Sequence, residues 1–224
     1  MILTHEKRVL CIDSSSTCVG WLLGNDTGRP TKWGEQRFPY KDGMLRASCA
    51  KEFIHDLIVR LAPDIVVTED LAVMTRNKEV TAMLNYILLS MKVSTIVQEC
   101  EFQSLNVSEI RKALGFPGHA EKCLIQARMV LKFFCTREEQ ATVSKLYTKI
   151  LSEHNAYPVM TAPGKPTKKN PNMELQARKN SITKIGKKAL SEYEGQIKSV
   201  YGIGPDLGDA AALYAWKVEH GRDD

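Results

Sequence analysis

Hydrophobic runs near the start of the chain predict three short β-strands. They cover residues 8–13, 18–24 and 32–38, and the turns between them, DSSST and GNDTGRPT, are rich in polar and turn-forming residues. Connections this short cannot carry a parallel crossover. The three runs therefore predict an antiparallel meander.

The next segments alternate between helical and strand patterns. Residues 43–61 repeat apolar side chains at helical spacing until Pro63 stops the pattern. The apolar run DIVVTED, at 64–70, follows this crossover helix, so we expect a strand parallel to the first one. The other predictions in this half are a helix over 77–99, a strand over 102–107 and a short helix over 108–114 with Ser108 as its N-cap.

The second half of the chain is predicted to be mainly helical. After the break GFPG, a long helix is expected over 119–152, and an exposed proline-rich loop follows over 155–172. Helical patterns continue over 173–201, and a Gly/Pro turn leads into a closing helix within 202–221. The order of elements predicts an α/β fold with a mixed five-stranded sheet, three antiparallel strands and then two parallel ones, flanked by helices.

Positive charge is concentrated in one segment. The formal net charge is +5, from 31 Lys and Arg against 26 Asp and Glu. Residues Met160 to Leu190 hold eight of the basic residues and one Glu, which gives that segment +7 and leaves +5 − 7 = −2 for the rest. A nearly neutral body with one basic segment indicates a polyanionic partner, most simply nucleic acid. The alternative is a solvated loop and helix face that contacts nothing.

Cysteine and histidine patterns do not match the common metal motifs. The six cysteines form no C-x-x-C pair and mostly lie in apolar stretches, where reduced Cys behaves as a small hydrophobic residue. The five histidines are scattered, so a zinc site is not expected. No apolar run approaches the roughly 18 residues that span a bilayer, and MILTHEKRVL lacks the hydrophobic region of a signal peptide. We therefore expect an intracellular protein, in the host cytoplasm if it is viral or bacterial.

Four acidic residues stand at the ends of predicted elements. Asp13 ends the first strand, Glu69 ends the fourth, and Asp206 and Asp209 lie three residues apart at the start of the last helix. In an open α/β sheet, functional groups gather beyond the carboxyl ends of parallel strands. Three of the four acids also have a plainer role, since Asp13 could cap a tight turn and the last two could cap a helix.

Four carboxylates in a single crevice would repel each other strongly without a cation. Mg²⁺ prefers oxygen ligands and keeps positions open for water and phosphate. Two such ions, about 4 Å apart, can activate water and stabilise the leaving oxygen in phosphodiester hydrolysis. This chemistry requires neither His nor Cys, which suits a chain with no cluster of either.

Four stretches of the sequence resemble the RuvC-type Holliday junction resolvases, which are nucleases of the RNase H-like superfamily. They are VLCIDSSSTCVGWLL, DIVVTEDLAVMTRN, SEIRKALGFPGHAEK and DLGDAAALYAW. The resemblance covers residues 8–130 and 202–220, and it implies an RNase H-like fold in a single domain over 1–224. It also implies a homodimer built through the helix at 77–99.

The resemblance implies roles for particular residues. Asp13, Glu69, Asp206 and Asp209 match a catalytic tetrad that binds two Mg²⁺ ions, for which Mn²⁺ can substitute. Arg111 and Lys122 match two basic residues that help to hold or act on the junction. The predicted DNA-binding residues are Arg76, Arg111, Lys112, Lys122, Lys168, Lys169, Lys187 and Lys188, the last four on charge alone. Arg76 could equally belong to the solvated start of a helix.

The chain departs from the family pattern in three places. Ser15 stands where the family often has a glycine, two residues after the first aspartate, and in this the chain resembles divergent phage or viral members. The aromatic wedge that some members carry after the glutamate is absent from residues 70–74. Residues 131–190 exceed the family's minimal core and are predicted to form a basic helical insertion.

The function that these patterns predict is a structure-selective endonuclease. It would resolve four-way DNA junctions by Mg²⁺-dependent phosphodiester hydrolysis, with paired nicks made by a two-fold dimer. One alternative is a nuclease of the same fold that cuts flaps, forks or RNA hybrids. A second is a non-catalytic junction-binding protein. A third, a phosphate-binding domain of the actin and sugar-kinase type, is disfavoured because residues 14–17 contain no Gly-rich phosphate loop.

Overall fold

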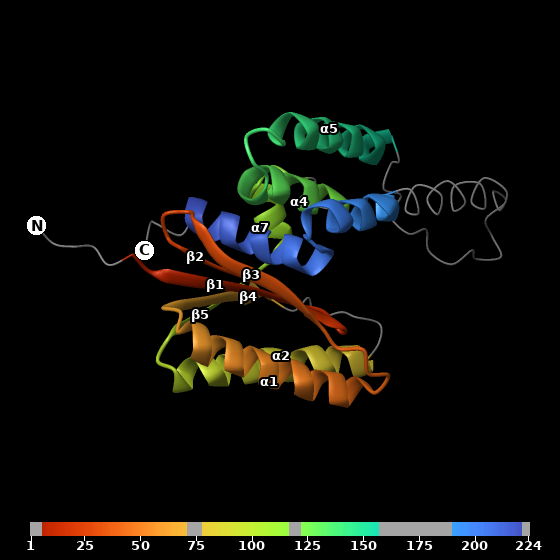
Figure 1. Cartoon of the computed structure of the whole chain (residues 1–224). Helices are drawn as coiled ribbons and strands as arrows, with labels where there is room; N and C mark the ends of the chain where they lie inside the picture. The colour runs from red at the N-terminus through yellow and green to blue at the C-terminus, as the bar shows by residue number, and fades with distance from the viewer. Residues whose placement is uncertain (1–5, 71–77, 117–121, 157–189, 221–224) are drawn as a thin grey trace, which may run out of the picture. The chain divides into compact units, whose positions relative to one another are not determined.

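The computed structural model describes residues 6–70, 78–116, 122–156 and 190–220, and these residues form a mixed sheet with helices (Figure 1). Five strands lie in the order β3-β2-β1-β4-β5. Their bounds are β1 Arg8–Ser14, β2 Cys18–Asn25, β3 Pro30–Arg37, β4 Ile65–Glu69 and β5 Glu101–Leu105. β1, β2 and β3 are antiparallel neighbours, whereas β4 is parallel to β1 and β5 is parallel to β4. The predicted α/β fold class and the five predicted strands are confirmed.

The chain divides into two compact units. We call Met1–Gly118 with Gly204–Asp224 the sheet unit, and His119–Ile203 the helical unit. The helical unit contains α4 (Lys122–Met129), a π-helical turn at Val130–Phe134, α5 (Gln140–Ala156) and a helix over 190–201. A single domain with an insertion over 131–190 stays a prediction.

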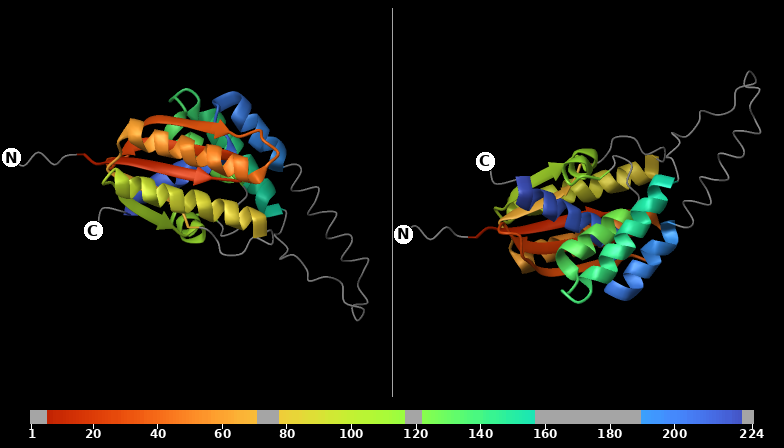
Figure 2. Two further views of the ribbon diagram at one scale, coloured as in Figure 1. Left: turned by 90° about the horizontal axis from the view of Figure 1, so that it is seen from below. Right: turned by 90° about the horizontal axis from the view of Figure 1, so that it is seen from above.

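In the sheet unit, helices cover both faces of the sheet. α1 (Gly43–Leu61) and α2 (Lys78–Val97) lie side by side across one face, and α7 (Pro205–His220) packs on the other (Figures 1 and 2). β1 is buried on both faces, which explains why its sequence is a continuous apolar run rather than an alternating one. The core between the sheet and α1 and α2 contains Leu10, Ile12, Val66, Ile54, Leu57, Ile58, Met83, Ile87 and Met91.

The ends of α1 follow capping rules that the sequence carries. The side chain of Asp42, the N-cap, accepts a hydrogen bond from the backbone N–H of Leu45 at 2.8 Å. At the other end Ala62 adopts a left-handed conformation with φ 41°, and Pro63 prevents continuation. The predicted bounds of 43–61 are therefore confirmed for α1.

The predicted cap of α3 (Val107–Ala113) was wrong by two residues. Asn106, not Ser108, is the N-cap, and its side-chain oxygen accepts from the backbone N–H of Ser108 at 2.9 Å. Asn is as good an N-cap as Ser, so the helix starts one residue earlier than expected.

The predicted long helix over 119–152 was also wrong. The π-helical turn ends at Cys135, whose backbone is extended, with φ −91° and ψ 146°. A new helix then begins because Thr136 and Glu139 form a reciprocal capping box. The backbone N–H and hydroxyl of Thr136 donate to the Glu139 carboxylate at 2.8 and 2.9 Å, and the Glu139 N–H donates back to the Thr136 hydroxyl at 3.3 Å.

Two further predictions concern the remaining segments. The loop predicted over 155–172 falls almost entirely outside the described residues, and of the helical stretch predicted over 173–201 only 190–201 is described, as a helix. The expectation that no segment reaches bilayer-spanning length was wrong for α2. Its 20 residues are long and apolar enough by length and composition, with 28% of the 18-residue window buried in the structure.

Two glycines in β2 allow α7 to lie directly on the sheet. A Cβ atom at Gly20 would overlap the carbonyl group of Asp206 and the amide nitrogen of Leu207, and one at Gly24 would overlap the ring of Tyr214. The Tyr214 hydroxyl, fitted against Gly24, donates a hydrogen bond to the carbonyl oxygen of Asn25 at 2.6 Å. β2 therefore carries glycine where the helix backbone and its largest buried side chain touch the strand.

Replacing Gly20 with Ala should destabilise the protein. The added methyl group meets helix backbone, which cannot move aside as a side chain could, so we expect the free energy of unfolding to fall by about 1–3 kcal/mol. Urea denaturation measures the change. Gly195→Ala is the matched control, because a Cβ there meets nothing within 4 Å and Ala favours a helix. Equal stability of Gly20→Ala and wild type would contradict the close packing of α7 on β2.

Candidate active site

Two of the predicted carboxylates stand side by side at one edge of the sheet. The parallel register of β1 and β4 pairs Ile12 with Thr68, so the next residues, Asp13 and Glu69, both follow at the carboxyl ends of neighbouring strands. The Thr68 hydroxyl donates to the carbonyl oxygen of Ile12 at 2.9 Å and ties the strand ends together. Asp13 is buried and Glu69 is half-buried. The prediction that these strands are neighbours is confirmed.

The other two carboxylates begin α7, close to the same edge. Asp206 and Asp209 lie in its first two turns and are both buried. Gly20 is the cross-strand partner of Asp13 and also the residue against which the backbone of Asp206 packs. One glycine therefore links the strand that carries the first aspartate to the helix that carries the last two.

Arg111 supplies positive charge next to this group. Its guanidinium Nη2 lies 3.8 Å from Oδ1 of Asp209, and the side chain of Arg111 is only 20% exposed. An ion pair between buried or half-buried groups offsets part of the cost of burying a carboxylate. The structure thus brings together Arg111, which the family resemblance singled out, and one member of the predicted tetrad.

Asp206 is held from β2 by a residue that the sequence interpretation missed. The Cys18 thiol forms a hydrogen bond with the Asp206 carboxylate. Burial and then the negative charge of Asp206 raise the pKa of Cys18 to about 12, so the thiol keeps its proton at neutral pH. Cys18 is consequently a hydrogen-bond donor to the carboxylate rather than a reactive thiolate.

A second missed residue, Glu35 on β3, supports the start of α7. One carboxylate oxygen of Glu35 accepts from the backbone N–H of Leu207 at 3.4 Å, and the side chain packs against Gly204. The first N–H groups of a helix have no partner within the helix, and negative charge is favourable there. Glu35 thereby fixes the turn that carries Asp206.

The other predicted DNA-binding residues are distributed over the chain. Lys112 follows Arg111 on α3 and is exposed, whereas Lys122 is half-buried at the start of α4 in the helical unit. Outside the described residues lie Arg76, Lys168, Lys169, Lys187 and Lys188.

The four carboxylates are suitable ligands for Mg²⁺ by their chemistry, but their side chains are not already arranged around a metal position. All four offer only oxygen ligands, and burying three of them at one edge is unfavourable unless positive charge compensates. Within the residues that the structure describes, however, no group of three or more Asp, Glu, His or Cys side chains lies close enough to hold a metal ion. An ion would therefore have to draw these side chains together.

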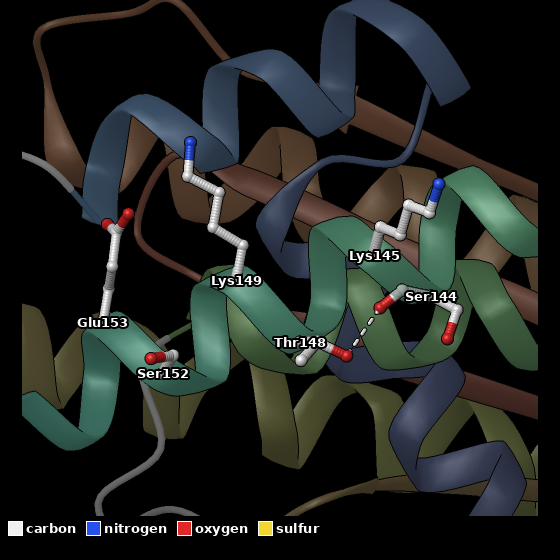
Figure 3. A pocket seen from close by; sticks show the side chains of 6 residues that line it. All are labelled: Ser144, Lys145, Thr148, Lys149, Ser152 and Glu153. Carbon is white, nitrogen blue, oxygen red and sulfur yellow. Dashed lines mark hydrogen bonds between the residues drawn. The ribbon is translucent and has the colours of Figure 1, made fainter.

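The helical unit has a hollow of its own, on the surface of α5. Its volume is about 490 Å³, and Figure 3 shows its lining side chains projecting from successive turns of this helix. The Thr148 hydroxyl donates a hydrogen bond to the carbonyl oxygen of Ser144 at 2.9 Å. The Tyr193 hydroxyl donates to the Glu153 carboxylate at 2.7 Å and also forms a hydrogen bond with Lys149. The lining residues are Ser144, Lys145, Thr148, Lys149, Ser152 and Glu153.

Comparison with solved structures shows that the fold is shared with a RuvC structure. The structure is similar to RuvC from T. thermophilus in complex with a Holliday junction substrate, with a TM-score of 0.50 and 14% sequence identity over 96% of this chain and 95% of that one. A second Thermus thermophilus RuvC structure gives 0.47 at 14% identity over 96% of each chain. The yeast mitochondrial Holliday junction resolvase gives 0.44 at 12% identity over 97% of this chain and 82% of that one.

The similarity to the junction-bound RuvC structure establishes the RuvC-type fold that the sequence predicted. No family model matches the chain, and no curated protein matches it in sequence. The shared fold is therefore established by structure alone, at an identity too low to carry residue roles across.

Cys18 should resist thiol reagents in the folded protein. Alkylation requires the thiolate, and a pKa of about 12 with a buried side chain leaves very little of it at pH 8. Mass spectrometry after iodoacetamide treatment should find Cys18 unmodified until the protein is unfolded, whereas the half-buried Cys49 serves as an internal comparison. Modification of Cys18 as fast as Cys49 in the native state would contradict the described environment.

Proposed function

We propose that this protein is a Mg²⁺-dependent endonuclease that resolves four-way DNA junctions. The observation that carries the proposal is that two strand ends and one helix start bring acids to one edge of the sheet. The strand ends carry Asp13 and Glu69, and the helix start carries Asp206 and Asp209. Its support from outside the chain is the shared fold with T. thermophilus RuvC, which was solved with a Holliday junction substrate.

The four carboxylates would hold two Mg²⁺ ions, with Mn²⁺ able to substitute. Bound Mg²⁺ supplies an activated water and stabilises the leaving oxygen of the broken phosphodiester bond. The chain's own residues orient this chemistry: Cys18 donates to Asp206, and Glu35 holds the helix start in place. The Arg111 guanidinium is partly exposed beside Asp209 and can donate to a phosphate oxygen of the DNA.

Paired nicks require two active sites related by two-fold symmetry, and α2 supplies a surface for such a dimer. Apolar side chains recur along its exposed side at spacings of three and four residues, at Ala82, Tyr86, Leu89, Val93 and Ile96. Leu89 is 63%, Val93 51% and Ile96 68% exposed. This 3-4 spacing is the pattern by which helices pack in pairs.

The inward face of α2 is a different set of residues. Met83 and Ile87 are 2% and 1% exposed and pack into the core with α1, so they cannot form part of a dimer interface. The dimer that we propose therefore uses the stripe from Ala82 to Ile96 and leaves the core face unchanged.

The alternatives within this fold are separable by substrate. A flap or fork nuclease would cut those structures in preference to an immobile four-way junction, and a non-catalytic binding protein would bind junctions without cutting in Mg²⁺. Cleavage of a panel of labelled branched DNAs, in Mg²⁺ and in Ca²⁺, distinguishes the three.

Asp13→Asn, Glu69→Gln and Asp209→Asn should each abolish most cleavage while junction binding in Ca²⁺ persists. Each change removes a charge at the proposed metal site and little volume. Losing several kcal/mol of transition-state stabilisation corresponds to a fall in rate of about 100-fold or more. Cleavage of an immobile junction in Mg²⁺ gives the rate, and the metal-induced rise in melting temperature gives a reading independent of activity.

Asp56→Asn is the matched control for these variants, because the same chemical change then falls on an exposed carboxylate of α1. It should cleave and respond to Mg²⁺ as wild type does. A tetrad variant that is folded by circular dichroism and retains near-normal cleavage would remove that residue from the proposed site.

Val93→Asp should convert the proposed dimer into a monomer. A charge in the middle of an apolar helix pair is costly to bury, and the same side chain is harmless in water. Sedimentation velocity should find wild type dimeric and Val93→Asp monomeric. Val200→Asp places the same change on a valine that is 63% exposed in the helical unit, and it should stay dimeric. A wild-type monomer that still makes paired nicks would refute the dimer.

A further inference from the structure

The segment that joins β3 to α1, together with the first turn of α1, leaves large apolar side chains exposed to water. Tyr40 is 46%, Met44 60% and Leu45 47% exposed. Arg37 and Lys41 are exposed in the same stretch, and we call these five residues the 37–45 corner. The only acid between positions 37 and 45, Asp42, is already engaged as the N-cap of α1. An exposed aromatic ring between two exposed cations is an unusual combination for a simple surface turn.

The corner starts at the same sheet edge as the proposed active site. β3 and β1 are both antiparallel to β2, so their carboxyl ends share one edge. The backbone N–H of Phe38 donates to the carbonyl oxygen of Thr17, in the turn after β1, at 2.9 Å. Arg37 is the register partner of Cys18, whose thiol bonds Asp206. DNA bound at the carboxylates would therefore have the corner beside it.

The backbone of the corner is held firmly although its side chains are exposed. The Arg46 guanidinium donates to the carbonyl oxygens of Tyr40 and Lys41 at 2.7 and 3.1 Å. Phe38 is buried and packs edge-on against Phe53, with ring centroids 6.2 Å apart. The Tyr40 ring is thus presented to solvent from a fixed position, which lowers the entropy that a binding partner would have to remove.

We propose that the 37–45 corner is a nucleic-acid contact in which Tyr40 stacks on an unpaired base and Arg37 and Lys41 bind the flanking phosphates. This inference rests on the proposed function and names a base-contacting surface within it. Aromatic rings stack on bases with little sequence preference, and Arg and Lys neutralise backbone phosphates. The cations favour a polyanion over an apolar protein surface as the occupant.

The test uses a four-way junction that carries 2-aminopurine beside the crossover, with Ca²⁺ in place of Mg²⁺ so that nothing is cut. Wild type and Tyr40→Phe should bind alike and change the fluorescence of the probe at saturating protein, because both present a ring. Tyr40→Ala should bind roughly 5- to 100-fold more weakly and lose the fluorescence change. Trp33→Ala is the matched control, since Trp33 is also 46% exposed but lies opposite Leu22 in the middle of β3.

The phosphate contacts have their own measurement. Arg37→Gln with Lys41→Gln should flatten the dependence of log affinity on log salt by up to about 1.8, or about 0.9 for each lost contact. Melting temperatures confirm that each variant is folded, and fluorescence at saturation remains informative if Tyr40→Ala is less stable.

The outcomes separate this inference from the function on which it rests. If wild type binds and cleaves the junction but Tyr40→Ala keeps its affinity and fluorescence change, the corner is not a base contact and the proposed function stands. If wild type neither binds nor cleaves branched DNA, the proposed function fails and the corner proposal fails with it.

Discussion

The close approach between the backbone of Gly20 and the first turn of α7 governs the candidate site. No other residue type leaves room for the Asp206 carbonyl at that point of β2. Because Gly20 also pairs with Asp13 in the sheet, the same contact decides where the α7 carboxylates stand relative to the strand carboxylate. Because Gly20 has no side chain, α7 can pack close enough to β2 to bring its two aspartates near the strand carboxylates.

The neighbours of the carboxylates explain how such a site can exist in a folded chain. Asp209 has the guanidinium of Arg111 near it, and Asp206 has the Cys18 thiol as a hydrogen-bond donor. Both partners offset part of the free-energy cost of burying the two carboxylates, but they do not neutralise all of the negative charge. The edge of the sheet therefore keeps an excess of negative charge that favours cations, and this is the physical basis of the function that we propose.

Two exposed apolar surfaces of the sheet unit differ in their charge, and so in the partner that each suits. The stripe on α2 from Ala82 to Ile96 has few charges along it, which suits the second copy of the chain that we propose as its partner. The 37–45 corner combines a ring with Arg37 and Lys41 and suits a polyanion. The side chains of neither surface are packed in the core, so each surface is available to an interaction outside the sheet unit.

The sequence by itself determined the five strands, the bounds of α1 and the order of the four acids, because strand runs, caps and strand ends are local properties. It could not decide which of two apolar stripes on α2 faces the core, since both recur at helical spacing. It missed the Thr136–Glu139 capping box although that signal is local. The roles of Cys18 and Glu35 beside the candidate site became visible only in the tertiary structure. Their partners lie in α7, 172 residues from Glu35 along the chain, and no local pattern encodes a contact made through packing.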